Sequence, residues 1–177
     1  MASPLIAFYS GAAPDHRGRF LRDIQQWSDE RLEAVHDYIQ WLFPLPEPSP
    51  VNPLAPLLDR PAIEAFHAQP ELRRSLGVSL ARMLRFYGLE LDSGPPPAVT
   101  RAENFAERAR NWLWPGNHNH LRITRILKCV RLSGLESEAR AFFECLTGIY
   151  EEERRKPRPE ITAETFRFWS AAVGPAG

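Results

Sequence analysis

The chain has 177 residues, 44% of them hydrophobic, and its 22 lysines and arginines are balanced by 22 aspartates and glutamates. This length fits one domain with its own core, and the hydrophobic content argues against disorder over most of the chain. Because the formal net charge is zero, we expect no nucleic-acid partner and no anionic membrane surface as a partner.

The cysteines and the N-terminus indicate a reducing compartment. Cys129 and Cys145 both lie in helical apolar patterns, and their spacing is not that of a disulfide framework or a metal knuckle. The first ten residues lack a basic region, and no window approaches ~20 uninterrupted apolar residues. We therefore expect a soluble cytoplasmic or nuclear protein without a transmembrane segment.

The first predicted helices lie before residue 44. Leu5 to Tyr9 form an apolar patch before several turn residues, and we expect an ordered loop over residues 1–18. The spacing of the apolar residues predicts a short helix over residues 19–27. Ser28, followed by two acidic residues, is typical of the cap of a further helix, which we expect to run without a break over residues 29–43.

The predicted 29–43 helix has one apolar face and ends at a run of prolines. Its apolar stripe consists of Leu32, Val35, Ile39, Leu42 and Phe43, whereas His36 and Gln40 stack one turn apart at the edge. Four prolines between residues 44 and 50 end the helix, because each fixes φ and removes a hydrogen-bond donor. Residues 44–58 are expected to form an extended strap whose leucines and Val51 lie against the core.

Helical periodicity dominates the remainder of the chain. We expect a loop over residues 92–99, a capping box formed by Thr100 and Glu103, a turn over residues 114–120, and no strand. Helices are predicted at residues 59–67, 70–87, 100–113, 119–134, 135–150 and 162–173. The sequence therefore predicts an all-α fold, a single compact domain of about seven to eight helices with a proline-rich extended strap.

The histidines of the NHNH segment are candidates for a metal site or for helix capping. His118 and His120 are two residues apart, but further ligands at a recognised spacing are missing. No Walker, HExxH or GxSxG pattern occurs, and no nucleophile is paired with a base. We therefore expect no metal, no cofactor and no catalytic residue.

Arg122 and Arg125 share one face of a helix close to its N-terminus. Two guanidinium groups at such a position are typical of a site for a carboxylate or phosphate. The alternative is that they pair with Glu33 or Asp37 of the predicted 29–43 helix.

Trp41, Trp112 and Trp114 also have two interpretations. They could form the aromatic wall of a binding site, or they could be core residues, because a tryptophan buries a large area and needs one hydrogen-bond partner.

Several segments in register resemble the conserved domain of the opioid growth factor receptor family. They are HDYIQWLFPLPEP at 36–48, FYGLEL at 86–91, RAENF at 101–105 with NW at 111–112, and NHNHLRITRILK at 117–128. The resemblance assigns residues 1–156 to this domain and leaves residues 157–177 as an exit segment with a last helix packed on it. It implies a helical domain without enzymatic activity. Vertebrate members are described as receptors for an enkephalin pentapeptide at the nuclear envelope.

The leading hypothesis is a non-catalytic binding module for a small peptide or a protein partner. The 29–43 helix, the strap and the turn at 114–122 are expected to surround a groove. Its walls would carry His36, Gln40, Trp41, His118, Asn119, Arg122 and Arg125. A tyrosine-led peptide with a free carboxylate would suit aromatic walls and an arginine.

Two other hypotheses stay open at this point. One is an enzyme of unknown class that uses His36 or His118 as a general base. The other is a docking scaffold, which predicts an exposed apolar patch in place of a closed pocket.

Overall fold

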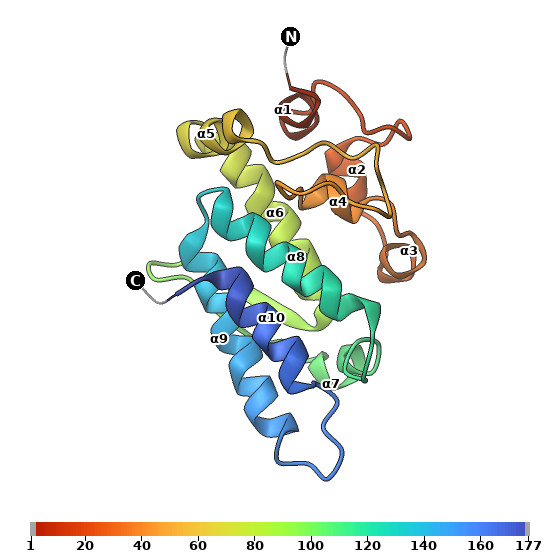
Figure 1. The fold of residues 1–177 in the computed structure, drawn as a ribbon, viewed down its shortest axis with the longest axis vertical. Helices are drawn as coiled ribbons and strands as arrows, with labels where there is room; N and C mark the ends of the chain where they lie inside the picture. Colours follow the sequence, from red (N-terminus) through yellow and green to blue (C-terminus); the bar gives the residue numbers. More distant parts are fainter. Residues whose placement is uncertain (1–2, 176–177) are drawn as a thin grey trace.

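The computed structural model describes residues 3–175, which form ten helices and one two-stranded hairpin (Figure 1). The helices are α1 (Pro4–Tyr9), α2 (Leu21–Gln25), α3 (Asp29–Ala34), α4 (Ile39–Leu42), α5 (Arg60–Ala68), α6 (Pro70–Tyr87), α7 (Phe105–Ala109), α8 (His118–Leu132), α9 (Glu136–Glu153) and α10 (Ala163–Val173). The prediction of a mostly helical single compact domain is confirmed. Ten helices replace the expected seven to eight because α1 was missed and one predicted helix is two.

Polar caps set several helix starts where the sequence indicated them. Ser28 Oγ accepts from the Arg31 N–H at the start of α3, and Asp59 Oδ1 accepts from the Ala62 N–H at the start of α5. Thr162 caps α10 in the same way. Such side chains replace a missing intrahelical partner of the first backbone N–H groups.

The core lies between α6 and the three C-terminal helices. Helices α8, α9 and α10 pack side by side, and α8 crosses α6 (Figure 1). The apolar stripe of α8 is part of this core, since Ile123, Ile126, Leu127 and Val130 are all fully buried. Trp169 of α10 is buried too, and its indole N–H donates to the His120 carbonyl at 3.1 Å.

The helix expected over residues 29–43 is wrong as one element. It ends at Ala34, Val35 is extended, and α4 begins only at Ile39. Tertiary partners replace the helical hydrogen bonds at this break. Arg122 donates to the carbonyls of Leu32 and Val35, both at 3.0 Å, and the Asn52 amide donates to the Asp37 carbonyl at 2.8 Å. The break turns α4 away from the direction of α3.

The expected loop at residues 1–18 contains α1. Its Leu5, Phe8 and Tyr9 are buried, and the Tyr9 hydroxyl donates to the Leu42 carbonyl at the end of α4. The apolar patch is therefore a short helix that covers the N-terminal side of the core. Its brevity hid it from periodicity, because six residues span fewer than two turns.

The expectation of no strand is wrong for residues 89–101. β1 (Leu89–Asp92) pairs antiparallel with β2 (Ala98–Arg101), with Leu89 opposite Arg101. Thr100 lies in β2, so the predicted capping box does not form, and α7 starts without a side-chain cap. Gly88 ends α6 with φ of 78°, a left-handed conformation that glycine adopts without steric cost, and redirects the chain into β1.

The strap over residues 44–58 lies against the core only in part. Leu58 is fully buried, and its N–H donates to the half-buried Leu45. Val51, Leu54 and Leu57 are 75%, 70% and 42% exposed, so their predicted packing is wrong. The segment is not extended but doubles back, since the Leu58 N–H meets the Leu45 carbonyl and the Ala55 N–H donates to the Asn52 carbonyl at 3.1 Å. Its buried anchor is the polar Asn52, bonded to Asp37. Val51, Leu54 and Leu57 therefore face outward, whereas Leu45 and Leu58 pack against the core.

Candidate functional site

A groove of about 360 Å³ lies between α4, the strap and the first turns of α8. Its polar lining consists of His36, Gln40, His118, Arg122 and Arg125, with Ser49 and Thr124. The apolar lining consists of Ile39, Leu45, Pro50, Val51 and Leu121. The structure thus brings together five of the seven residues proposed from the sequence, across about 80 residues of chain.

Two of the seven residues do not line the groove. Trp41 is 5% exposed, and its indole N–H donates to His16 Nδ1 at 2.9 Å on the side that faces Phe8. Asn119 is fully buried behind the groove, where its amide donates to Glu33 at 3.1 Å and its oxygen accepts from Arg122. Both side chains support the site from within the core.

The apolar part of the lining is aliphatic, and no tryptophan contributes to it. Trp112 is fully buried and donates to the Tyr87 carbonyl at 3.0 Å, whereas Trp114 is 47% exposed but lies outside the lining. The core interpretation is therefore right for Trp41 and Trp112. Sequence reasoning missed Val51 and Leu121; the available signal was that Leu121 falls outside the buried stripe of α8.

Arg122 links the groove to the break between α3 and α4. It is 6% exposed and donates to Leu32, Val35 and Asn119, and its Nη1 lies 3.8 Å from Glu33 Oε2. The predicted pairing of an arginine with Glu33 thus holds for Arg122, at the outer limit of an ion pair. Its main partners are backbone carbonyls, which fix its position at the base of the groove.

Asp37, the other proposed partner, pairs elsewhere. Arg17 approaches it at 3.1 Å and Arg19 at 2.7 Å. Burial raises the pKa of the Asp37 carboxyl, but the hydrogen bond and positive charge of Arg19 outweigh it and hold that pKa below its ordinary value. Asp37 therefore forms its ion pairs with Arg17 and Arg19 and not with Arg122 or Arg125.

Arg125 has no carboxylate within salt-bridge distance among residues 3–175. Its Nη1 donates to the Phe43 carbonyl at 3.1 Å, and nearby Glu47 is bound by Lys128 at 2.7 Å. Burial lowers the pKa of the Arg125 guanidinium from its ordinary value, because partial desolvation disfavours the charge. An anion in the groove would offset that cost.

His36 and His118 meet edge to face, with ring centroids 5.4 Å apart. His36 Nδ1 lies 3.1 Å from Arg122 Nη2, so it accepts a hydrogen bond, and His118 Nε2 lies 3.3 Å from Glu33 Oε1. Desolvation and the charge of Arg122 lower the pKa of His118 despite the opposing effect of Glu33. This lowered pKa favours the neutral imidazole of His118, and Arg122 and Arg125 bring positive charge to the groove.

Gln40 lines the groove, and its side chain has one buried oxygen without a hydrogen-bond partner among residues 3–175. The residue is 6% exposed; its Nε2 donates weakly to the His36 carbonyl at 3.4 Å, and its Oε1 has no partner. An unsatisfied buried acceptor costs about 1–3 kcal/mol. A donor that entered the groove would relieve this cost.

The two histidines of the NHNH segment have different environments. His120 points into the core, where its Nε2 lies 2.9 Å from the Trp112 carbonyl, and His118 lines the groove. In the part of the chain that the structure describes, no three side chains of histidine, cysteine, aspartate or glutamate are grouped to hold a metal ion. The segment also contributes a cap, because Asn117 Oδ1 accepts from the Asn119 N–H at 2.8 Å.

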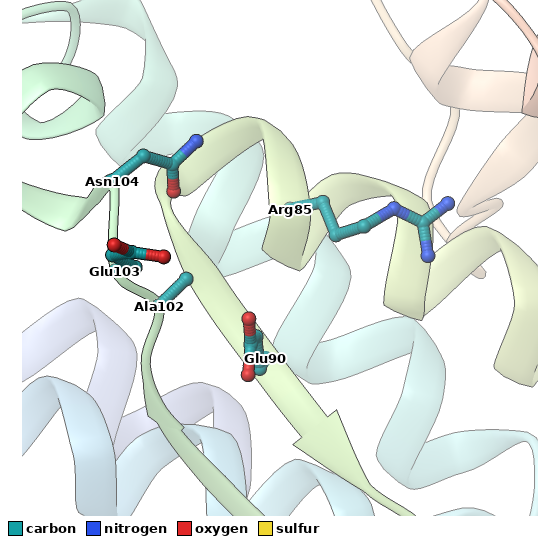
Figure 2. A pocket seen from close by; sticks show the side chains of 5 residues that line it. All are labelled: Arg85, Glu90, Ala102, Glu103 and Asn104. Carbon is teal, nitrogen blue, oxygen red and sulfur yellow. The ribbon is translucent and has the colours of Figure 1, made fainter.

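A larger hollow of about 550 Å³ lies beside the hairpin (Figure 2). Arg85 of α6, Glu90 of β1 and residues 102–104 line it. Figure 2 shows the Arg85 guanidinium extending away from Asn104 and Glu103. The polar groups do not converge on one point, so this hollow has a weaker claim to a ligand than the groove.

Comparisons with known proteins agree with the resemblance seen in the sequence. Residues 6–173 match the model of the opioid growth factor receptor (OGFr) conserved region. The chain is 47% identical over 122 residues to the mouse opioid growth factor receptor. The aligned region covers 67% of this chain and 19% of that protein. For the human protein of the same name, the identity is 44% over 122 residues, covering 67% of this chain and 18% of that protein.

A second group of relatives is named opioid growth factor receptor-like protein 1. The Xenopus tropicalis protein is 44% identical over 108 residues, covering 61% of this chain and 20% of its own length. The matched region is thus about a fifth of each of these relatives, which are named as receptors and not as enzymes. No solved structure matches the chain. Among the described residues, no helix combines the length and apolar character needed to cross a membrane.

Proposed function

The chain belongs to the opioid growth factor receptor family, and on that premise we propose that it is a non-catalytic module that binds a short peptide in the groove. The observation that carries the proposal is the convergence of His36, Gln40, His118, Arg122 and Arg125 on one groove with an aliphatic lining. A few polar groups in a mainly apolar concavity are typical of ligand sites. The names of the relatives support a receptor-like role.

The exposed apolar residues around the groove support a peptide or protein ligand. Val51 and Leu121 both line it and are 75% and 73% exposed. Leu54, three residues after Val51 in the strap, is 70% exposed as well. Apolar side chains gathered around a polar pocket are typical of interaction sites, and a bound peptide would remove them from water.

Calorimetric titration tests this proposal. The probe is a tyrosine-led enkephalin pentapeptide with a free carboxylate, and the control is a scrambled peptide that ends in glycine. We expect saturable heat from the first peptide and little from the second. Leu121→Arg, a substitution at an exposed position, should abolish the heat by filling the groove, whereas Val78→Arg on the exposed face of α6 should not. Equal heat from both peptides would refute the proposal.

A second candidate function, hydrolysis with His118 as general base, rests on its contact with Glu33. Glu33 Oε1 lies 3.3 Å from His118 Nε2, so the carboxylate would orient the imidazole while Nδ1 accepts a proton from water. No activated hydroxyl or thiol of the described residues completes a triad here, which favours the binding module. Incubation of the same pentapeptide, followed by mass spectrometry, separates the two. Cleavage that is lost in His118→Gln would support the enzyme, and intact peptide would exclude it for this substrate.

A further inference from the structure

The groove has an aliphatic mouth and a positively charged base. Val51 from the strap and Leu121 from α8 stand at the mouth and are mostly exposed. An apolar ligand side chain placed between them would bury area on both. The mouth therefore selects for an aliphatic group.

Arg125 supplies the positive charge with spare hydrogen-bonding capacity. Among residues 3–175, its guanidinium makes one hydrogen bond, to the Phe43 carbonyl, which uses one of its five N–H groups. Glu47 is engaged by Lys128, and Glu33 lies closer to Arg122. A ligand carboxylate would thus find a partly desolvated guanidinium without a bound counter-ion.

The side-chain oxygen of Gln40 favours a ligand that donates a hydrogen bond. Its Oε1 is buried without a partner, while the residue itself lines the groove. Rotation of the amide toward the groove would present this oxygen to a ligand N–H. Donor, carboxylate and aliphatic group are the three groups that surround one Cα atom at the carboxyl end of a peptide.

We infer that the groove recognises the carboxyl-terminal residue of a peptide, and that this residue is aliphatic. Its carboxylate binds Arg125, its backbone N–H donates to Gln40, and its side chain lies between Val51 and Leu121. Capture of a terminal carboxylate is a known mode of peptide recognition. A groove of about 360 Å³ is near the lower limit for ligand sites, which suits a chain end better than a segment that passes through.

This inference rests on the proposed function and differs from recognition of an N-terminal tyrosine, for which the groove offers no aromatic wall. Two peptide libraries, randomised at their last four positions, test it. One has free carboxyl termini and the other is amidated, and each is passed over the immobilised full chain. We expect at least tenfold stronger retention of the free acids, with leucine, isoleucine or valine enriched at the last position, because a charge-assisted hydrogen bond is lost on amidation.

Three variants connect the result to the groove. Arg125→Gln should remove the preference for the free acid, and Arg125→Lys should keep part of it. Val51→Ser, at an exposed position, should weaken the aliphatic preference without affecting the fold. Val78→Ser, exposed on α6 and outside the groove, is the matched control.

The outcomes separate this inference from the proposed function. Equal retention of the two libraries would overturn the inference and leave peptide binding intact. Enrichment of aspartate or glutamate in the amidated library would also overturn it, because the carboxylate would then come from a side chain. Failure of both libraries, together with silent calorimetry, would overturn the proposed function as well.

Discussion

Arg122 holds the break between α3 and α4. Its replacement by methionine should lower the urea midpoint of unfolding by more than the same replacement at any exposed arginine. Methionine keeps much of the apolar stem but donates no hydrogen bond. The Val35 carbonyl, bonded at 3.0 Å, then loses its Arg122 donor, and the Leu32 carbonyl keeps the Tyr38 hydroxyl at 3.1 Å. The Asn119 oxygen also loses the guanidinium.

The magnitude follows from the two backbone contacts. A hydrogen bond from a charged donor is worth about 1.5–3 kcal/mol, so two of them give about 3 kcal/mol at the lower limit. The Glu33 contact adds little, because it is 3.8 Å long and the side chain of Glu33 is 38% exposed. With a urea m-value of about 2 kcal/mol/M, the midpoint should fall by about 1.5 M.

Urea unfolding followed by tryptophan fluorescence measures this shift, since Trp41 and Trp112 are buried in the folded chain. Arg60→Met is the control, because the side chain of Arg60 is 90% exposed and its pair with Glu64 is worth less than about 0.5 kcal/mol. Arg122→Lys should fall between the two. A midpoint for Arg122→Met within about 0.3 M of the Arg60→Met value would refute the assignment of the break to Arg122.

Three further predictions concern backbone conformation and pH. Gly88→Ala should destabilise by about 2 kcal/mol or more in thermal unfolding, because φ is +78° and the added Cβ would lie 2.8 Å from Arg108 Cβ; an unchanged melting temperature would contradict the geometry. Gly148→Ala in α9 should stabilise by about 0.5–1 kcal/mol, since the added Cβ meets no atom within 4 Å; a lower melting temperature would count against this. Burial lowers the pKa of His118 and His120 below the ordinary value of 6.5. As the pH falls through 6.5, the unfolded chain therefore binds protons at these two histidines before the folded chain does. Their contribution to the free energy of unfolding is complete above pH 6.5 and is lost below it. The urea midpoint between pH 7.5 and 5 measures this loss, which should shrink in His118→Gln; a midpoint that rises toward pH 5 would refute it.

Local patterns in the sequence predicted most helices. The α8 and α10 stripes, the caps at Ser28 and Asp59, and the end of α6 at Gly88 depend on neighbours within about four residues of one another. Such neighbours can be identified without knowing the fold. The same locality explains why the arginines and histidines of the groove could be singled out from two unusual segments.

Three of the misses depend on partners that are remote in the sequence. The expected helix over residues 29–43 breaks because Arg122, 87 residues beyond Val35, donates to its carbonyl. The strap turns Val51 outward because Asn52 is held by Asp37, and Trp41 leaves the groove because His16 accepts its N–H. No periodicity within a segment contains this information, since each partner competes with the local hydrogen bonds only after the chain has folded.

The amino-acid order by itself determined the helical class, most helix limits and which two segments carry the unusual polar side chains. Only the tertiary structure decided that these segments meet, that aliphatic side chains line the groove between them, and that Arg125 faces it without a carboxylate. The physical reason is range: helix stripes and caps are set by adjacent turns, whereas a groove and its charge are set by side chains that only folding brings together.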